Sequence, residues 1–216
     1  MIRTLFLLAA ATCTLPGELV DRVAVALGNQ AVTLSAIDEQ IRVSAFLNRQ
    51  PADFSPVHRR RMAERMIEQT LLRREMEASR FTLPGGSEVS AALERTRKDR
   101  GETEAEFQAA MTKYGVGADA LARNLVFQLT ILRFIELRFR PGSTVSDGEV
   151  EIYYRETFVP AWERRNAAGV TPPDLDDARE EIEQVLLQTK VDQSMDEWLK
   201  QTRARTRVRF LEEAFQ

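Results

Sequence analysis

The chain has 216 residues, enough for one sizeable hydrophobic core or for one core with a small satellite. Its composition, with 44% hydrophobic and 29% charged residues, is that of a globular protein and excludes a disordered or fibrous chain. Thirty basic residues against thirty-three acidic ones leave a net charge of -3, so the basic footprint of a nucleic-acid-binding protein is missing and no nucleic-acid partner is expected.

The N-terminal residues have the pattern of a secretory signal peptide. Arg3 supplies a positive charge, residues 5–11 form an unbroken apolar run, and small residues end that run. We therefore expect a signal peptide over residues 1–17, with cleavage between residues 11 and 18. The run is far shorter than the ~20 residues needed to span a bilayer, so we expect no transmembrane segment. Lipid anchoring at Cys13 is the alternative, although the residues before it match a lipobox poorly.

A β-like pattern follows over residues 21–33. Apolar residues alternate with small or polar ones as far as Leu27, and Gly28-Asn29 then supplies a tight turn, so we predict a short β-hairpin. Helical spacing of apolar residues begins near Ser35, with Asp38 at the spacing of an imperfect capping box.

Most of the remaining chain is predicted to be helical. Capping signals occur at residues 55–56, 87, 103–106 and 146–149, and glycine or proline breaks occur at residues 84–86, 115–117 and 141–142. A long final helix begins at Asp174 or Asp176. The fold class is therefore mainly α.

The alternating run at residues 208–211 predicts one more strand near the C-terminus. A lone strand needs a partner, and the other β signal in the sequence is the hairpin near Asp21. We therefore expect a single helical domain in which a small β-sheet joins the N-terminal hairpin to the C-terminal strand.

Three segments resemble the SurA family of periplasmic chaperones. LVDRVAVALGNQAVTLSAIDEQI, residues 19–41, is similar to the start of the mature proteins, and VSDGEVEIYYRETF, residues 145–158, to the segment that leads out of the helical domain. Residues 179–215 resemble the helix and strand that return to complete it. The resemblance implies an N-terminal chaperone domain over residues 18–158, completed by residues 176–216, in a periplasmic protein.

The chain departs from that family after residue 158. The family carries one or two parvulin isomerase domains there, whereas residues 159–175 are only seventeen positions, far fewer than the roughly 50 of an independent domain. We expect residues 159–175 to be a linker that replaces the parvulin domain. A parvulin site also needs several histidines, and His58 is the one histidine of the sequence.

Sequence motifs for catalysis are also missing. HExxH, GxSxG, P-loop, GxGxxG and CxxC patterns do not occur, so we expect no enzyme, no catalytic residue, no metal site and no cofactor. The resemblance instead implies an ATP-independent holding chaperone that binds unfolded polypeptides, mainly outer-membrane proteins, through an apolar groove. The alternatives are a non-catalytic or partner-dependent isomerase, and an interaction protein that forms a homodimer.

Methionine and aromatic side chains are the candidates for the binding surface, because they repack around partners of different shapes. Core packing is the ordinary alternative for each of them taken alone. The aromatic run over residues 153–162 is the strongest candidate for exposure, since it lies beside the missing domain. The candidate residues are Met62, Met66, Met111, Tyr114, Phe127, Phe134, Tyr153, Tyr154, Phe158 and Trp162.

Overall fold

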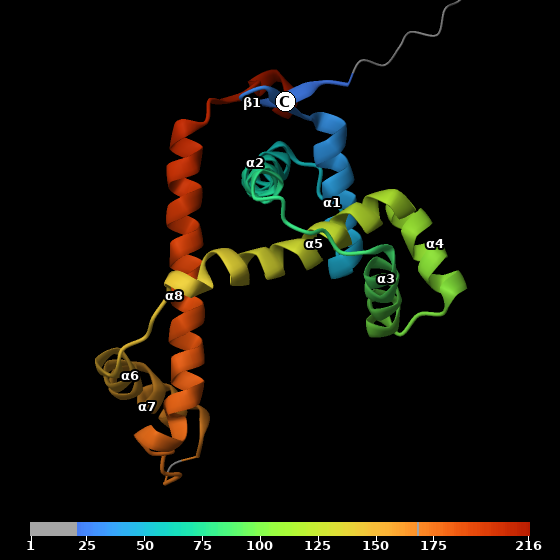
Figure 1. The fold of residues 1–216 in the computed structure, drawn as a ribbon. Helices are drawn as coiled ribbons and strands as arrows, with labels where there is room; N and C mark the ends of the chain where they lie inside the picture. The colour runs from blue at the N-terminus through green and yellow to red at the C-terminus, as the bar shows by residue number, and fades with distance from the viewer. Residues whose placement is uncertain (1–20, 168) are drawn as a thin grey trace, which may run out of the picture.

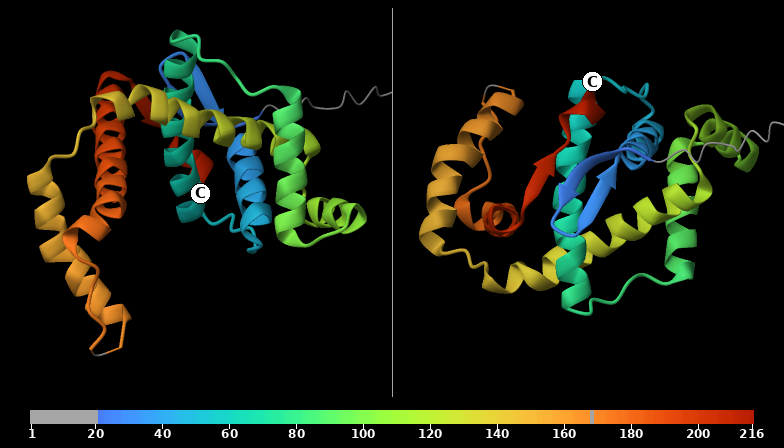
Figure 2. Two further views of the ribbon diagram at one scale, coloured as in Figure 1. Left: turned by 60° about the horizontal axis from the view of Figure 1, so that its bottom comes forward. Right: turned by 90° about the horizontal axis from the view of Figure 1, so that it is seen from above.

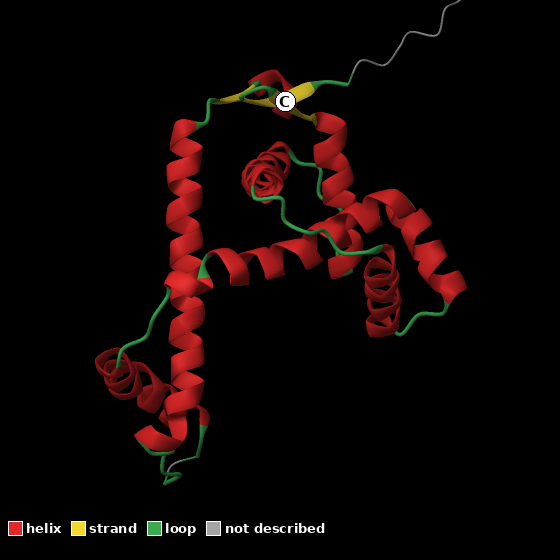
Figure 3. Ribbon diagram, in the orientation of Figure 1, coloured by secondary structure: helices red, strands yellow, loops and turns green. Residues whose placement is uncertain are grey.

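The computed structural model describes residues 21–167 and 169–216, so the predicted signal peptide and Cys13 lie outside the described residues. Helices make up most of the described chain, and a three-stranded antiparallel sheet lies at one end (Figure 3). The predicted mainly α fold with a small sheet is confirmed. Over the described residues, no helix combines the length and the apolar character needed to cross a membrane.

The sheet joins the two ends of the described chain. β1 (Val23–Leu27) pairs with β2 (Gln30–Thr33) on one side and with β3 (Val208–Phe210) on the other, both antiparallel. Gly28 has a φ of 60°, the left-handed conformation that the tight turn between β1 and β2 requires. The expected sheet between the N-terminal hairpin and the C-terminal strand is therefore present.

The helices keep the labels of Figure 1. A π-helical turn, Tyr154–Phe158, joins α6 to α7, and short 3-10 turns occupy Arg140–Gly142 and Glu212–Phe215. The helices are α1 (Leu34–Asn48), α2 (Pro56–Ala78), α3 (Gly86–Arg100), α4 (Glu104–Tyr114), α5 (Ala118–Arg138), α6 (Asp147–Tyr153), α7 (Val159–Arg165) and α8 (Leu175–Arg205).

Two helices start before their predicted capping residues. The hydroxyl of Thr33 accepts the N–H of Ala36 and caps α1, whereas the predicted cap Ser35 lies within the first turn. α3 starts after Gly85, which offers no side-chain cap, and the predicted cap Ser87 again lies two positions further along. Ser35 and Ser87 therefore lie in the first turns of their helices and are not the capping residues.

Helix α2 lies at the centre of the molecule. Figure 1 shows it end-on, with α1 and α8 on either side, the sheet above it and α5 crossing beneath it. Helices α3 and α4 lie at the far end of α5. The C-terminal half of α8 lies beside α2, and its N-terminal half extends away from the body together with α6 and α7, as Figure 2 also shows. We call α6, the π-helical turn, α7 and the N-terminal half of α8 the arm.

Four groups of buried apolar side chains hold these parts together. The first lies between the hairpin, α1, α2 and the C-terminal residues Ala214 and Phe215. The second surrounds Phe46 and joins α1 to α4 and the start of α5. The third surrounds Phe134, between α2, α5 and α8. The fourth surrounds Val150 and lies within the arm, which therefore has a small core of its own.

The segment expected to be a linker, residues 159–175, begins with the helix α7. Phe158 stacks on Tyr154 with 5.8 Å between ring centroids, and Trp162 stacks on Phe158 at 6.1 Å. The helical backbone runs on from α6 through the π-helical turn into α7, and Pro160 is the second residue of α7. The expectation of a linker is therefore wrong for residues 159–165.

Substitution of Phe215 tests whether the C-terminal residues are part of the first core. It is buried, 6.0 Å from Phe210 between ring centroids, with the guanidinium of Arg60 5.8 Å from its ring. Phe215→Ala should lower the free energy of unfolding by about 3 kcal/mol, measured by urea titration, because it removes a buried ring. The neighbouring exposed residue provides the control, and Gln216→Ala should change that free energy by less than about 0.5 kcal/mol. Equally small effects would show that the C-terminus does not belong to the core.

Candidate functional site

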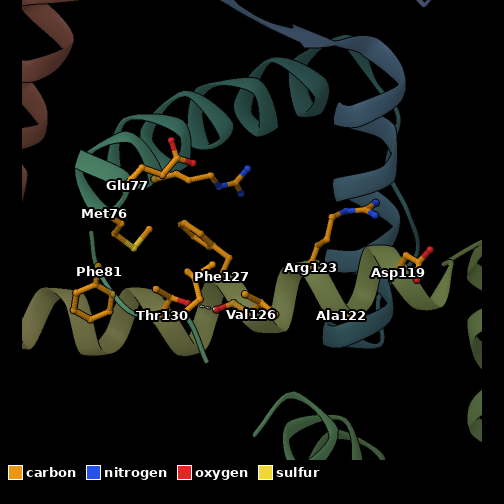
Figure 4. A pocket seen from close by; sticks show the side chains of 11 residues that line it. Met76, Glu77, Phe81, Asp119, Ala122, Arg123, Val126, Phe127 and Thr130 are labelled. Atoms are coloured by element: carbon orange, nitrogen blue, oxygen red, sulfur yellow. Dashed lines mark hydrogen bonds between the residues drawn. The ribbon is translucent and has the colours of Figure 1, made fainter. Parts of the chain in front are cut away.

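A hollow of about 550 Å³ lies between the C-terminal half of α2, the loop that follows it and α5 (Figure 4). We call it the central hollow. Met76 of α2 and Phe127 of α5 point toward one another across it, and Phe81 lies at one end. Val126 and Leu83 add further apolar surface. The hollow can therefore accept an apolar side chain without rearrangement of the surrounding helices.

The rim of the central hollow carries two residues of each charge. Arg73 and Glu77 come from α2, and Asp119 and Arg123 come from α5. The guanidinium of Arg73 lies 5.5 Å from the centroid of the Phe127 ring, a distance at which a cation is attracted to an aromatic face. Because the rim has no net charge, it provides no selection for the charge of an occupant.

A second hollow of about 550 Å³, the lateral hollow, lies between α2 and the C-terminal half of α8. Its apolar lining includes Leu71 and Leu72 of α2, Met195 and Leu199 of α8, and Phe127 of α5. Phe127 therefore belongs to both the central and the lateral hollow, and the two are neighbours around α2.

Two acidic residues, Glu68 and Asp196, line the lateral hollow. Burial raises the pKa of Glu68, and the nearby carboxylates of Glu64 and Asp196 act in the same direction. Arg203 opposes this shift, but it also forms an ion pair with Glu64 at 2.5 Å. The position is therefore a less favourable place for a negative charge than open solvent.

A third hollow of about 680 Å³, the outer hollow, lies between residues 79–82 and the C-terminal part of α5. Phe81 lines both the outer and the central hollow. Leu132 and Leu137 line the outer hollow and are 66% and 69% exposed, and Leu83 in the central hollow is 61% exposed. The central hollow shares Phe127 with the lateral hollow and Phe81 with the outer hollow. We call the three hollows together the apolar track.

The candidates from the sequence are distributed unevenly relative to this track. Phe127 lies at its centre. Met62, Met111 and Phe134 are buried in the cores, so the prediction that they form a binding surface is wrong for these three. Their helical spacing reflects a side of the helix that faces other helices.

Two further candidates lie away from the apolar track. Met66 is partly buried against the first core and lines a separate hollow of about 330 Å³ beside β2. Tyr114 packs edge-on against Phe46 in the second core, with 5.8 Å between ring centroids. Neither residue contributes to the walls of the track.

The aromatic run of the arm is half-buried. Tyr153, Tyr154 and Phe158 pack around the core of the arm, and the hydroxyl of Tyr154 donates to the carbonyl oxygen of Pro173 at 2.9 Å. Trp162 is also half-buried, and its Nε1 atom has no hydrogen-bond partner among the described residues. The expected exposed aromatic surface is therefore largely used inside the arm.

The exposed leucines of the track were not among the candidates from the sequence. α5 has apolar residues on almost every side, which is typical of a helix that is covered by several neighbours or offers surface to a partner. Leu132 is on a side of α5 that is largely exposed among the described residues. Leu83 directly precedes the break at residues 84–86, and its position in a loop is compatible with exposure. The apolar pattern of α5 and the loop position of Leu83 can both be read from the sequence, but neither tells which side chains are exposed.

The lining of the track combines apolar and charged side chains. Apolar side chains line all three hollows, charged side chains flank the central hollow, and Glu68 lies on the wall of the lateral hollow. Across residues 21–167 and 169–216, no group of three or more His, Cys, Asp or Glu side chains is placed to hold a metal ion.

A scan of the chain against protein-family models finds no match, and a search of curated proteins finds none either.

An ion pair whose strength depends on pH holds α6 against α8. Lys190 of α8 lies 2.7 Å from a carboxylate oxygen of Glu149, which also accepts the N–H and the hydroxyl of Ser146. Lys190 contributes most and Ser146 next to lowering the pKa of Glu149 from 4.5 to about 2. Because the folded-state pKa is depressed, this contribution to stability is complete above pH 4.5 and is lost as the pH falls toward 2.

Substitution of this carboxylate should therefore have a pH-dependent effect. Glu149→Gln should destabilise the protein at pH 7, and the difference from the unsubstituted protein should shrink from pH 4.5 downward and vanish near pH 2. Urea titrations across this pH range measure the difference. The exposed residue Glu151 on the same helix gives the control substitution Glu151→Gln. A Glu149→Gln difference that stays constant from pH 7 to 2 would contradict the proposed role of the pair.

Proposed function

We propose that the protein is an ATP-independent holding chaperone that binds unfolded polypeptides along the apolar track. The observation that carries this proposal is the set of three adjoining hollows with shared walls and three exposed leucines. Contiguous exposed apolar surface with a polar rim is typical of sites for other polypeptides. Several hollows in a row fit an extended chain, which can place one apolar side chain in each.

The affinity of such a site follows from the burial of a few side chains. Each Leu or Phe that is transferred from water into a hollow contributes about 1.5–3 kcal/mol. Ordering the flexible chain and losing its free motion cost several kcal/mol, so that two or three occupied hollows leave a modest net affinity. A client can then dissociate without ATP, as a holding chaperone requires.

Adaptability comes from the side chains that line the hollows. Met76 and Met195 are unbranched and have several rotatable bonds, so they can adjust to occupants of different shapes. The balanced charges of the central rim add no strong preference of their own. These features support binding of many unfolded chains in preference to one folded partner.

The resemblance supports the cellular setting of the proposal. It implies that the protein acts in the periplasm on outer-membrane proteins, and the predicted signal peptide over residues 1–17 is consistent with export. Between residues 158 and 176, where the family carries an isomerase module, this chain has α7 and a short connection. We therefore propose holding without proline isomerisation.

Suppression of aggregation tests the proposal. An equimolar amount of the protein should suppress light scattering when an unfolded β-barrel protein is diluted out of urea. The double variant Leu83→Gln/Leu132→Gln should need about tenfold more protein for the same suppression, because it removes apolar contacts from two hollows. Both side chains are well exposed, so the variant should keep the stability of the original protein.

Val57→Gln is the matched control for these substitutions. Val57 is 66% exposed at the start of α2 and does not line the track. This variant should suppress aggregation as well as the original protein. Absence of suppression at severalfold excess of the original protein would contradict the proposal, and isomerisation of a proline-containing peptide by the isolated protein would overturn the statement that it is not catalytic.

A further inference from the structure

Four described helices are followed by a residue with left-handed backbone. Gly101 and Gly115 follow α3 and α4 with φ of 66°, whereas Arg49 and Arg80 follow α1 and α2 with φ of 56° and 53°. Glycine adopts this conformation without the steric cost that other L-residues bear. Arginine therefore occupies two positions at which glycine would be less strained. The backbone conformation does not account for arginine at these positions, whereas contacts of its side chain can.

The backbone at Arg80 closes α2 with a Schellman motif. The N–H of Phe81 donates to the carbonyl oxygen of Met76 at 2.9 Å, and the N–H of Arg80 donates to that of Glu77 at 3.1 Å. This closure places Phe81 beside Met76 in the central hollow and Arg80 in the lining of the outer hollow. The strained residue therefore lies where the two hollows adjoin.

The two arginines differ in what their side chains contact. Arg49 donates from Nη2 to the carbonyl oxygen of Asp99 at 3.2 Å and so links α1 to the end of α3. Within the described part of the chain, the guanidinium of Arg80 has neither an ion pair nor a hydrogen bond. A structural contact explains Arg49, and none explains Arg80.

The other charges of the outer hollow are already paired. Arg133 lies 3.0 Å from Glu88, and Glu136 lies 2.6 Å from Arg140. Among the residues that the structure describes, this leaves the positive charge of Arg80 without a partner beside the exposed side chains of Leu132 and Leu137. The complementary ligand is a group that has apolar surface and one negative charge.

We propose that the outer hollow binds an acidic side chain of the client, Asp or Glu next to an apolar residue, with its carboxylate paired to Arg80. This inference rests on the proposed function and specifies which segments the apolar track prefers. Because the outer hollow adjoins the central hollow at Phe81, a chain in the central hollow continues past Arg80. An internal side chain, in preference to a chain end, is therefore the expected partner.

Peptide binding measured by fluorescence anisotropy tests the inference. Two labelled peptides with the same leucine-rich sequence and an amidated C-terminus differ only in one internal residue, Glu or Gln. The Glu peptide should bind about three- to fivefold more tightly, as expected for an exposed ion pair, and the difference should shrink at high salt.

Arg80→Gly separates this role from stability. It should abolish the preference for the Glu peptide, so that the Glu and Gln peptides bind the variant with equal affinity. Its melting temperature should stay the same or rise by up to about 4 °C, because glycine relieves the left-handed strain. Arg80→Asn, which also tolerates this conformation, should give the same loss of preference.

Arg49→Gly is the matched control, since it removes an arginine from the same backbone position after α1 and should keep the preference for Glu. Arg80→Glu should instead favour a Lys version of the peptide. Equal binding of the Glu and Gln peptides would overturn the role of Arg80 and leave the proposed function standing. Failure of both peptides to bind would overturn the proposed function itself. If a Gln peptide with a free C-terminal carboxylate binds more tightly than its amidated form in a way that depends on Arg80, while the amidated Glu and Gln peptides bind equally, the hollow accepts chain ends and the inference is overturned.

Discussion

The pairing of β1 with strands from both ends of the chain is the constraint on which the arrangement around α2 depends. Because Val25 pairs with Phe210, the C-terminal strand must return to the hairpin, and α8 must run beside α2 to deliver it. The C-terminal half of α8 thereby supplies Met195 and Leu199 to the lateral hollow. α5 crosses beneath α2 between α8 and α1 (Figure 1). The central hollow lies between α2 and α5, and the lateral hollow between α2 and α8.

Local chemistry explains which parts of the fold could be predicted from the sequence. The capping boxes at Thr103 and Ser146 form as predicted, because each depends on residues only three positions apart. Exposure was not predictable in the same way. A stripe that includes Met62 has the same spacing whether it faces a core or solvent, so only the packing of distant helices decides. The same holds for Leu132 of α5, which is 66% exposed.

The aromatic side chains of the arm pack within its own small core. Its rings lie against Val150, Ala178 and Ile182, and a small core of this kind needs most of their surface. Ion pairs between Lys190 and Glu149 and between Arg179 and Asp147 attach α6 to α8. Exposed apolar side chains occur on α5 and the loop after α2, at Leu83, Leu132 and Leu137, and also on the arm, at Ile152 and Val185.

Hydrogen exchange with and without an equimolar unfolded β-barrel protein tests the central claim most directly. Binding along the apolar track predicts slower exchange in residues 76–83 and 119–137, which contribute the walls of the central and outer hollows. Helix α4 lies outside the track and should exchange at an unchanged rate. Slower exchange confined to the arm, or unchanged exchange throughout a protein that has bound its client, would contradict binding along the track.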